Sequence, residues 1–157
     1  WDATSGEQLL EAAGFYKTTD PQGQCFVTLT DNFAAMIWDM RTGVNLGTIT
    51  GHRDEITSIE FSPDSERLIT SSWDGTARVW NSRNGVEILN LGDHEKQVWR
   101  AHFSPDGNRI VTASEDGTAL IWPFATDKLL ELAEPAVQRY TPILTPTELA
   151  RFGLTGN

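Results

Sequence analysis

The chain has 157 residues, of which 39% are hydrophobic and 22% are charged, a composition typical of a folded domain rather than a disordered segment. Acidic residues outnumber basic ones by 22 to 12, and the net charge of −10 argues against a protein that binds nucleic acid through a basic surface. No apolar segment approaches the roughly 20 residues of a membrane-spanning helix, and the single cysteine cannot form an internal disulfide.

An internal repeat extends over most of the sequence. Trp38, Trp80 and Trp122 follow one another at intervals of 42 residues. The segment 51–80 aligns with 93–122 without a gap, and 13 of the 30 aligned positions are identical. An ungapped match of this length indicates duplication, so we expect repeated structural units.

A first copy, which has diverged in sequence, precedes these two. The segment 21–38 aligns with 63–80, but Phe33 stands where the later copy has Gly75, and about five residues are missing before it. Trp1 matches the tryptophan that ends each copy. We therefore expect the chain to be part of a longer protein, with a strand near residues 6–12 that belongs to the outer edge of a preceding unit.

Within one copy the pattern predicts strands. Short runs rich in β-branched and aromatic residues alternate with turn residues such as Asp74-Gly75, where glycine accepts the positive φ of a tight hairpin. Four antiparallel strands in about 42 residues make one blade of a β-propeller. In the second copy the predicted strands are 56–61, 67–72, 77–80 and 86–91.

The motifs of these copies resemble the WD-repeat (Trp-Asp repeat) β-propellers. The resemblance covers residues 1 to about 124 and implies an all-β fold of about three four-stranded blades in an incomplete ring, with repeats at about 6–38, 44–80 and 86–122. It rests on Gly51-His52, on FSPD at 61–64 and 103–106, and on DGTARVW at 74–80 and DGTALIW at 116–122.

The resemblance also implies a hydrogen-bonded tetrad in each well-preserved copy. An indole N–H can only donate, so a buried tryptophan needs an acceptor such as a threonine hydroxyl. A hydrolase triad uses similar residue types, but the recurrence at the same offset in each copy favours a structural role, and we expect no catalytic residue. The tetrads would be His52, Thr70, Asp74 and Trp80, then His94, Thr112, Asp116 and Trp122.

Three other features carry further predictions. His102 alternates with apolar positions along its strand, so we expect it to point away from the core. Cys25 aligns with Arg67 and Arg109, which predicts an outward position. The sequence shows no ligand spacing of a zinc or calcium site and no dinucleotide fingerprint, so we expect no metal and no cofactor.

By resemblance, the end of the propeller that carries the Asp-Gly turns binds partners. Trp73 and Trp99 lie there, and the aligned residues Glu115 and Thr57 show that the repeat does not require them. Exposed tryptophan beside arginine is typical of interface hot spots, although both rings could instead pack on neighbouring loops. We call the predicted surface the candidate face, and its residues are Arg53, Glu55, Thr57, Trp73, Gln97, Trp99, Arg100 and Glu115.

The segment 125–157 predicts a short helical tail. Leucines at 129, 130 and 132 fall on one face of a helix that Pro135 ends, and Thr145 and Glu148 form a capping box for a second helix. This tail resembles the end of bacterial multidomain WD-repeat proteins, in which an effector domain precedes the propeller.

Together these features predict a non-enzymatic scaffold or sensor platform, part of a larger, cytoplasmic bacterial signalling protein. Its partner would be a protein rather than nucleic acid or a membrane, with the missing blades supplied by the same longer chain or by other copies. Two alternatives stay open. One is a self-assembling module that closes a ring from several chains, and the other is an enzyme with its active site in the central channel.

Overall fold

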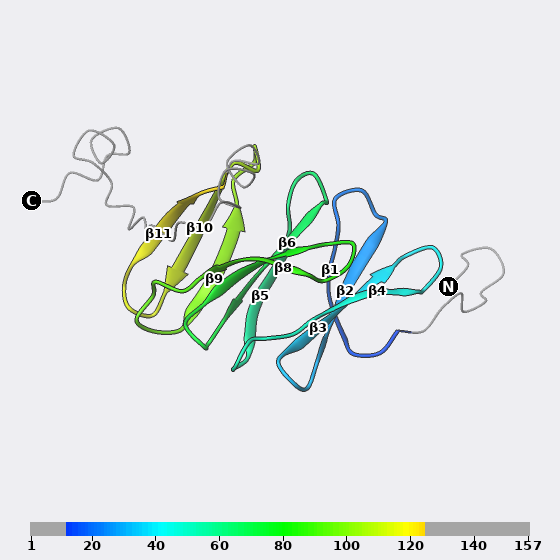
Figure 1. Cartoon of the computed structure of the whole chain (residues 1–157), viewed down its shortest axis with the longest axis horizontal. Helices are drawn as coiled ribbons and strands as arrows, with labels where there is room; N and C mark the ends of the chain where they lie inside the picture. The colour runs from blue at the N-terminus through cyan, green and yellow to red at the C-terminus, as the bar shows by residue number, and fades with distance from the viewer. Residues whose placement is uncertain (1–11, 125–157) are drawn as a thin grey trace, which may run out of the picture. The chain divides into compact units, whose positions relative to one another are not determined.

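The computed structural model of the chain describes residues 12–124 (Figure 1). The strand expected near residues 6–12 falls almost wholly outside the described residues, and the helical tail expected over 125–157 falls wholly outside them. The described part is all-β, and none of its residues form a helix that could cross a membrane. Its strands are β1 (Phe15–Thr19), β2 (Cys25–Thr30), β3 (Ala34–Asp39), β4 (Asn45–Ile49), β5 (Ile56–Phe61), β6 (Arg67–Ser72), β7 (Ala77–Asn81), β8 (Glu87–Leu91), β9 (Val98–Phe103), β10 (Arg109–Ser114) and β11 (Ala119–Pro123).

The strands form three antiparallel sheets in chain order. Sheet 1 contains β1 to β4, sheet 2 contains β5 to β8, and sheet 3 contains β9 to β11. Within each sheet, a strand pairs with the next one along the chain, which is the blade pattern predicted from the repeat. Sheet 3 has three strands within the described residues, which end directly after β11.

The tight turns keep one conformation even where the sequence has diverged. Gly75 has a φ of +83° between β6 and β7, as the Asp-Gly signal predicts. Phe33 occupies the aligned turn of sheet 1 and also has a positive φ, +54°, which is uncommon for a residue with a side chain. The first copy therefore preserves the hairpin although it has lost the glycine.

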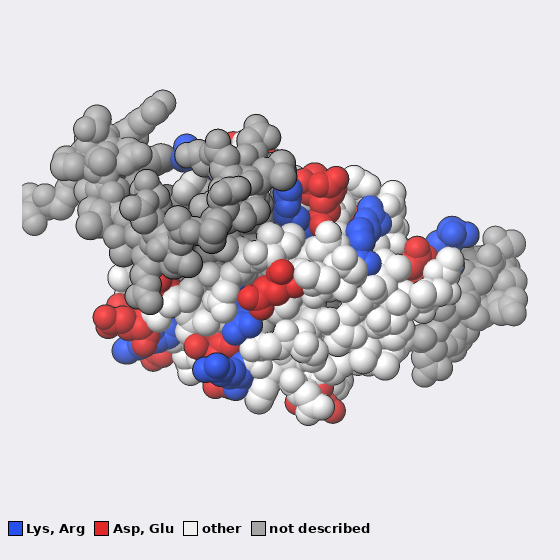
Figure 2. Space-filling view, viewed as in Figure 1, with Lys and Arg blue, Asp and Glu red and all other residues white. Residues whose placement is uncertain are grey.

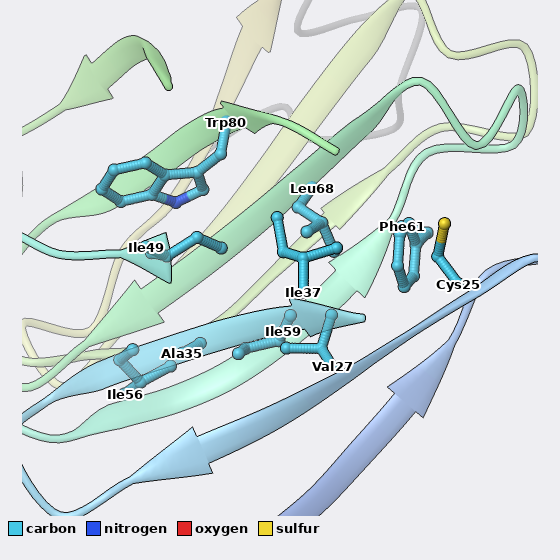
Figure 3. Packing of buried hydrophobic residues seen from close by; sticks show 10 residues of the cluster. All are labelled: Cys25, Val27, Ala35, Ile37, Ile49, Ile56, Ile59, Phe61, Leu68 and Trp80. Atoms are coloured by element: carbon cyan, nitrogen blue, oxygen red, sulfur yellow. The ribbon is translucent and has the colours of Figure 1, made fainter. Parts of the chain in front are cut away.

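The hydrophobic core shown in Figure 3 lies between sheets 1 and 2. Alternate residues of a strand point to opposite faces, so each sheet has a leading face toward the next sheet along the chain and a trailing face toward the preceding one. The leading face of sheet 1 contributes Cys25, Val27, Ala35, Ile37 and Ile49, and the trailing side of sheet 2 contributes Ile56, Ile59, Phe61, Leu68 and Trp80.

Burial differs between sheets 2 and 3 although their sequences match. Every residue of β6 is buried, whereas β10 alternates between exposed and buried residues. Ile69 is 0% exposed, and its counterpart Val111 is 39% exposed. Sheet 2 lies between two sheets, whereas the described residues place no sheet on the leading face of sheet 3.

Coverage by a neighbouring sheet also explains why the predicted outward position of Cys25 is wrong. Its side chain is not outward but buried in the core, beside Phe61 (Figure 3). Burial raises the pKa of its thiol, although the Arg83 guanidinium, 3.7 Å from Sγ, acts in the opposite direction. The aligned Arg67 is also buried, with its guanidinium over the ring of Phe124, while Arg109 on sheet 3 is exposed. A position that is outward in an isolated sheet becomes buried when the next sheet covers it.

Candidate functional site

The first predicted tetrad is complete in sheet 2. The indole Nε1 of Trp80 donates to Thr70 Oγ1 at 2.9 Å, and His52 Nε2 lies 2.7 Å from the same oxygen. His52 Nδ1 lies 2.9 Å from Asp74 Oδ2. These contacts join the loop before β5 to strands β6 and β7 and to the turn between them.

The partners determine the direction of each hydrogen bond. Asp74 accepts, so His52 donates from Nδ1 and its Nε2 accepts from the Thr70 hydroxyl, while Thr70 Oγ1 accepts from the indole. Burial lowers the pKa of His52, although Asp74 acts in the opposite direction, so the imidazole is neutral at physiological pH. Burial would raise the pKa of Asp74, but hydrogen bonds from Thr76, from the Arg53 amide and from His52 lower it to about 2.

The second tetrad repeats this geometry in sheet 3. His94 Nδ1 lies 2.9 Å from Asp116 Oδ2, and His94 Nε2 lies 2.7 Å from Thr112 Oγ1. Trp122 Nε1 donates to Thr112 Oγ1 at 3.0 Å. The eight residues predicted for the two tetrads thus come together as two equivalent networks.

Sheet 1 keeps only part of this network. Trp38 Nε1 donates to Thr28 Oγ1 at 2.9 Å, but this copy has no histidine before β1. The Thr28 hydroxyl donates instead to the carbonyl of Ala13 at 2.6 Å. In this first copy a backbone carbonyl replaces the imidazole as the acceptor of the threonine hydroxyl.

Each intact tetrad includes a second threonine that the sequence analysis missed. Thr76 Oγ1 donates to Asp74 Oδ1 at 2.6 Å, and Thr118 makes the equivalent bond to Asp116. The Asp-Gly-Thr motif at 74–76 and 116–118 contains the signal, because a hydroxyl two residues after a turn aspartate reaches its carboxylate.

The tetrads are unsuited to nucleophilic catalysis. Thr70 and Thr112 are each 0% exposed, and each hydroxyl oxygen is shared between an indole and an imidazole. A substrate carbonyl could reach neither oxygen without displacing the tryptophan. The geometry therefore serves to hold each hairpin against the preceding loop.

The candidate face divides into exposed and structural residues. Six of its members are exposed, and Gln97 is half-buried. Thr57 is also half-buried, and its hydroxyl donates to the carbonyl of Val98 at 2.7 Å, so it connects sheet 2 to sheet 3. The six exposed members are Arg53, Glu55, Trp73, Trp99, Arg100 and Glu115.

The two tryptophans of the candidate face flank the junction between sheets 2 and 3. Trp73 follows β6, and its amide donates to the carbonyl of Glu55 at 3.0 Å. Trp99 lies in β9 directly after Val98, the residue that accepts from Thr57. The two residues are 38% and 47% exposed, respectively, so each keeps accessible surface at this junction.

Charge on the surface is mixed in sign. In the view of Figure 2, acidic and basic side chains lie interspersed around a broad uncharged area. Within residues 12–124, no three His, Cys, Asp or Glu side chains lie close enough together to hold a metal ion. His102 is half-exposed on β9, as predicted, and its Nδ1 contacts the carboxylate of Glu60 on the neighbouring sheet.

A pocket of about 450 Å³ opens at the other end of the sheets, among the turns β1–β2, β3–β4 and β7–β8. Arg41 and Arg83, which occupy the same position in successive repeats, both line it together with Asp39. The sequence analysis did not single out this pocket, because it forms only where two sheets meet.

Comparison with known proteins supports the repeat assignment. The model of the family described as "WD domain, G-beta repeat" matches residues 43–81 and 85–123. The chain is 31% identical over 82 residues to pre-mRNA-processing factor 19 homolog 2 of Arabidopsis thaliana, covering 48% of this chain and 16% of that protein. It is 35% identical over 57 residues to periodic tryptophan protein 2 of Saccharomyces cerevisiae, covering 35% of this chain and 6% of that protein.

A solved structure shows the same fold. The crystal structure of the computationally designed Ika4 protein matches with a TM-score of 0.59 and 24% identity, over 70% of this chain and 64% of that one. The chain spans less than a fifth of the length of the two natural relatives.

Proposed function

The chain belongs to the WD-repeat family through its repeats at 43–81 and 85–123, and on that premise we propose that it is a non-catalytic scaffold that binds a protein partner. The partner would bind at the loop end of sheets 2 and 3, on the exposed part of the candidate face. WD-repeat domains generally serve as rigid platforms for protein interaction, and the two tetrads supply that rigidity here.

The observation that carries this proposal is the exposure of Trp73 and Trp99. A large aromatic side chain that remains accessible on a rigid backbone is the residue type most enriched in interface hot spots. The Trp73 amide bonds to Glu55 within sheet 2, and Val98, the residue before Trp99, accepts from Thr57 across the junction, so ordering these segments on binding would cost little entropy. Arg100 follows Trp99 in the sequence, and the Arg53 amide bonds to Asp74, the residue after Trp73, so the two arginines would supply donors for a polar rim.

A finer proposal concerns the setting of the scaffold. The tail at 125–157 resembles bacterial multidomain proteins, which would make the chain the sensor part of a larger cytoplasmic signalling protein. The natural relatives reported above come from a plant and a yeast, so they lend this setting no support. The bacterial and signalling assignments stay predictions that rest on the tail alone.

Affinity capture tests the proposed binding surface. The chain is immobilised and exposed to an extract of the cells that make it, in parallel with Trp99→Ser and Trp73→Ser variants. Val86→Ser is the matched control, because Val86 is 58% exposed and lies outside the candidate face. We expect at least tenfold less of a specific protein to bind the tryptophan variants, with no loss for the control. Equal capture by all four proteins would refute the assignment of this surface.

A further inference from the structure

Within the described residues, the first and last sheets expose faces of opposite kinds. On the leading face, Val27 and Ile69 are 0% exposed, but their counterpart Val111 in sheet 3 is 39% exposed. The same holds along the next strand, where Ala35 and Ala77 are buried and Ala119 is exposed. Sheet 3 thus presents the surface that sheets 1 and 2 each bury against their successor.

The trailing face shows the opposite pattern. Ile59 of sheet 2 and Ala101 of sheet 3 are buried opposite their tetrad threonines. Tyr16 pairs with Thr28 at the corresponding place in β1 and is 65% exposed. Trp38 likewise is half-buried, whereas Trp80 is 1% exposed. Sheet 1 therefore presents the surface that sheets 2 and 3 each bury against their predecessor.

From this pairing we infer that a second copy of the chain docks head to tail, its sheet 1 packing by the trailing face onto the leading face of sheet 3. The contact continues an interface that the chain already forms within itself, since the junction of sheets 1 and 2 joins the same two kinds of face (Figure 3). Apolar side chains of Val111 and Tyr16 would leave water, and burial of such area is the main source of association free energy.

The mode of contact is heterologous, because it joins two different surfaces. Such a contact builds closed rings or open chains rather than a symmetric pair.

Light scattering on the whole chain tests the inference. We expect assemblies of two or more copies at micromolar concentration. Val111→Glu and Tyr16→Glu should each give a monomer, because each charge lies in one of the two docking surfaces. Both positions are exposed in the single chain, so we expect both variants to fold, and circular dichroism checks this. Val86→Glu, on neither surface, should assemble like the unaltered chain.

Mixing the two monomeric variants provides the decisive measurement. Each variant keeps one intact docking surface, so a head-to-tail contact allows the mixture to form a 1:1 dimer of the Val111→Glu and Tyr16→Glu chains. A monomeric unaltered chain would overturn the inference. So would assemblies that persist in the folded variants, or a mixture that stays monomeric. Partner capture by the candidate face is a separate readout, so either proposal can fail without the other.

Discussion

At the residue scale, the Thr70 hydroxyl forms two buried hydrogen bonds at once. Its hydroxyl accepts from the indole of Trp80 and donates to the imidazole of His52, and all three side chains are buried. Removing the hydroxyl leaves two buried polar groups without a partner, which costs more than the bond itself contributes. Thr28 holds the matching position in sheet 1 but serves only the half-buried Trp38 and a backbone carbonyl.

This contrast predicts different costs for the same substitution. Thr70→Val should lower the free energy of unfolding by about 2–4 kcal/mol, since two buried groups lose their partner. Thr28→Val should cost about 1 kcal/mol, because Trp38 is only half-buried. Urea denaturation of both variants measures the difference. A loss for Thr70→Val no larger than that for Thr28→Val would show that the tetrad does not stabilise sheet 2.

The tetrad also predicts how stability depends on pH. The folded state lowers the pKa of His52. As the pH falls below about 6.5, this histidine is therefore protonated in the unfolded chain while it is still neutral in the folded chain. This contribution to stability is therefore present above about pH 6.5 and is lost as the pH falls below it. The lowered pKa of Asp74, about 2, adds a second loss as the pH falls from 3.8 toward 2.

Thermal melting at pH 7.5 and pH 5.5 measures the first of these losses. We expect a lower melting temperature at pH 5.5, and a smaller difference between the two pH values in a His52→Asn variant. His102→Asn is the control, because His102 is half-exposed and outside the tetrads. If the two variants responded to pH identically, the assignment of the pH dependence to His52 would be wrong.

At the element scale, the β1–β2, β5–β6 and β9–β10 turns share one backbone conformation. Gly23, Ser65 and Gly107 occupy the same repeat position with φ values of +68°, +63° and +69°. Glycine adopts this left-handed region without strain, whereas a residue with a Cβ atom is strained there by about 1–2 kcal/mol. Sheet 2 therefore contains a strained serine where its neighbours have glycine.

Ser65→Gly should accordingly stabilise the protein. Relief of the strain exceeds the entropy that glycine gains in the unfolded chain, and we expect a net increase of about 0.5–1 kcal/mol in the free energy of unfolding. Ser65→Ala retains the Cβ atom and with it the backbone strain, so it should be less stable than Ser65→Gly. Chemical denaturation distinguishes the variants, and equal stability of the glycine and alanine variants would contradict the argument.

At the scale of the whole molecule, contacts between sheets decide which residues are buried. Sheet 2 is covered on both faces and sheet 3 on one, so identical repeat positions differ in exposure. The junction of sheets 1 and 2 is also close at its outer edge. A Cβ atom at Gly47 of β4 would lie 2.3 Å from the carbonyl carbon of Asn84 in the β7–β8 turn.

Gly47→Ala tests the closeness of this junction. The added methyl group must displace backbone atoms of the neighbouring sheet, and we expect a loss of about 1–3 kcal/mol. Gly92→Ala is the matched control, because its Cβ atom would meet nothing nearer than 3.4 Å. A loss for Gly47→Ala that matched the control would mean that the two sheets are not held at this distance.

The sequence by itself determined the features that depend on neighbours along the chain. Strands β5 and β6 lie at the predicted residues, and both tetrads assemble from residues at a fixed repeat offset. Hairpin pairing and turn chemistry act over a few residues, so they leave a pattern in each repeat. That pattern was enough to identify the family and to place eight tetrad residues.

Only the tertiary structure decided what depends on the next sheet. Cys25 was predicted to point outward and is buried, while Thr57, predicted to face a partner, bonds across to Val98. Val111 has almost the same local sequence as Ile69, yet it is exposed. Equivalent positions in a repeat have the same local conformation but different surroundings. Burial is set by whether another sheet covers that face, which no single repeat encodes.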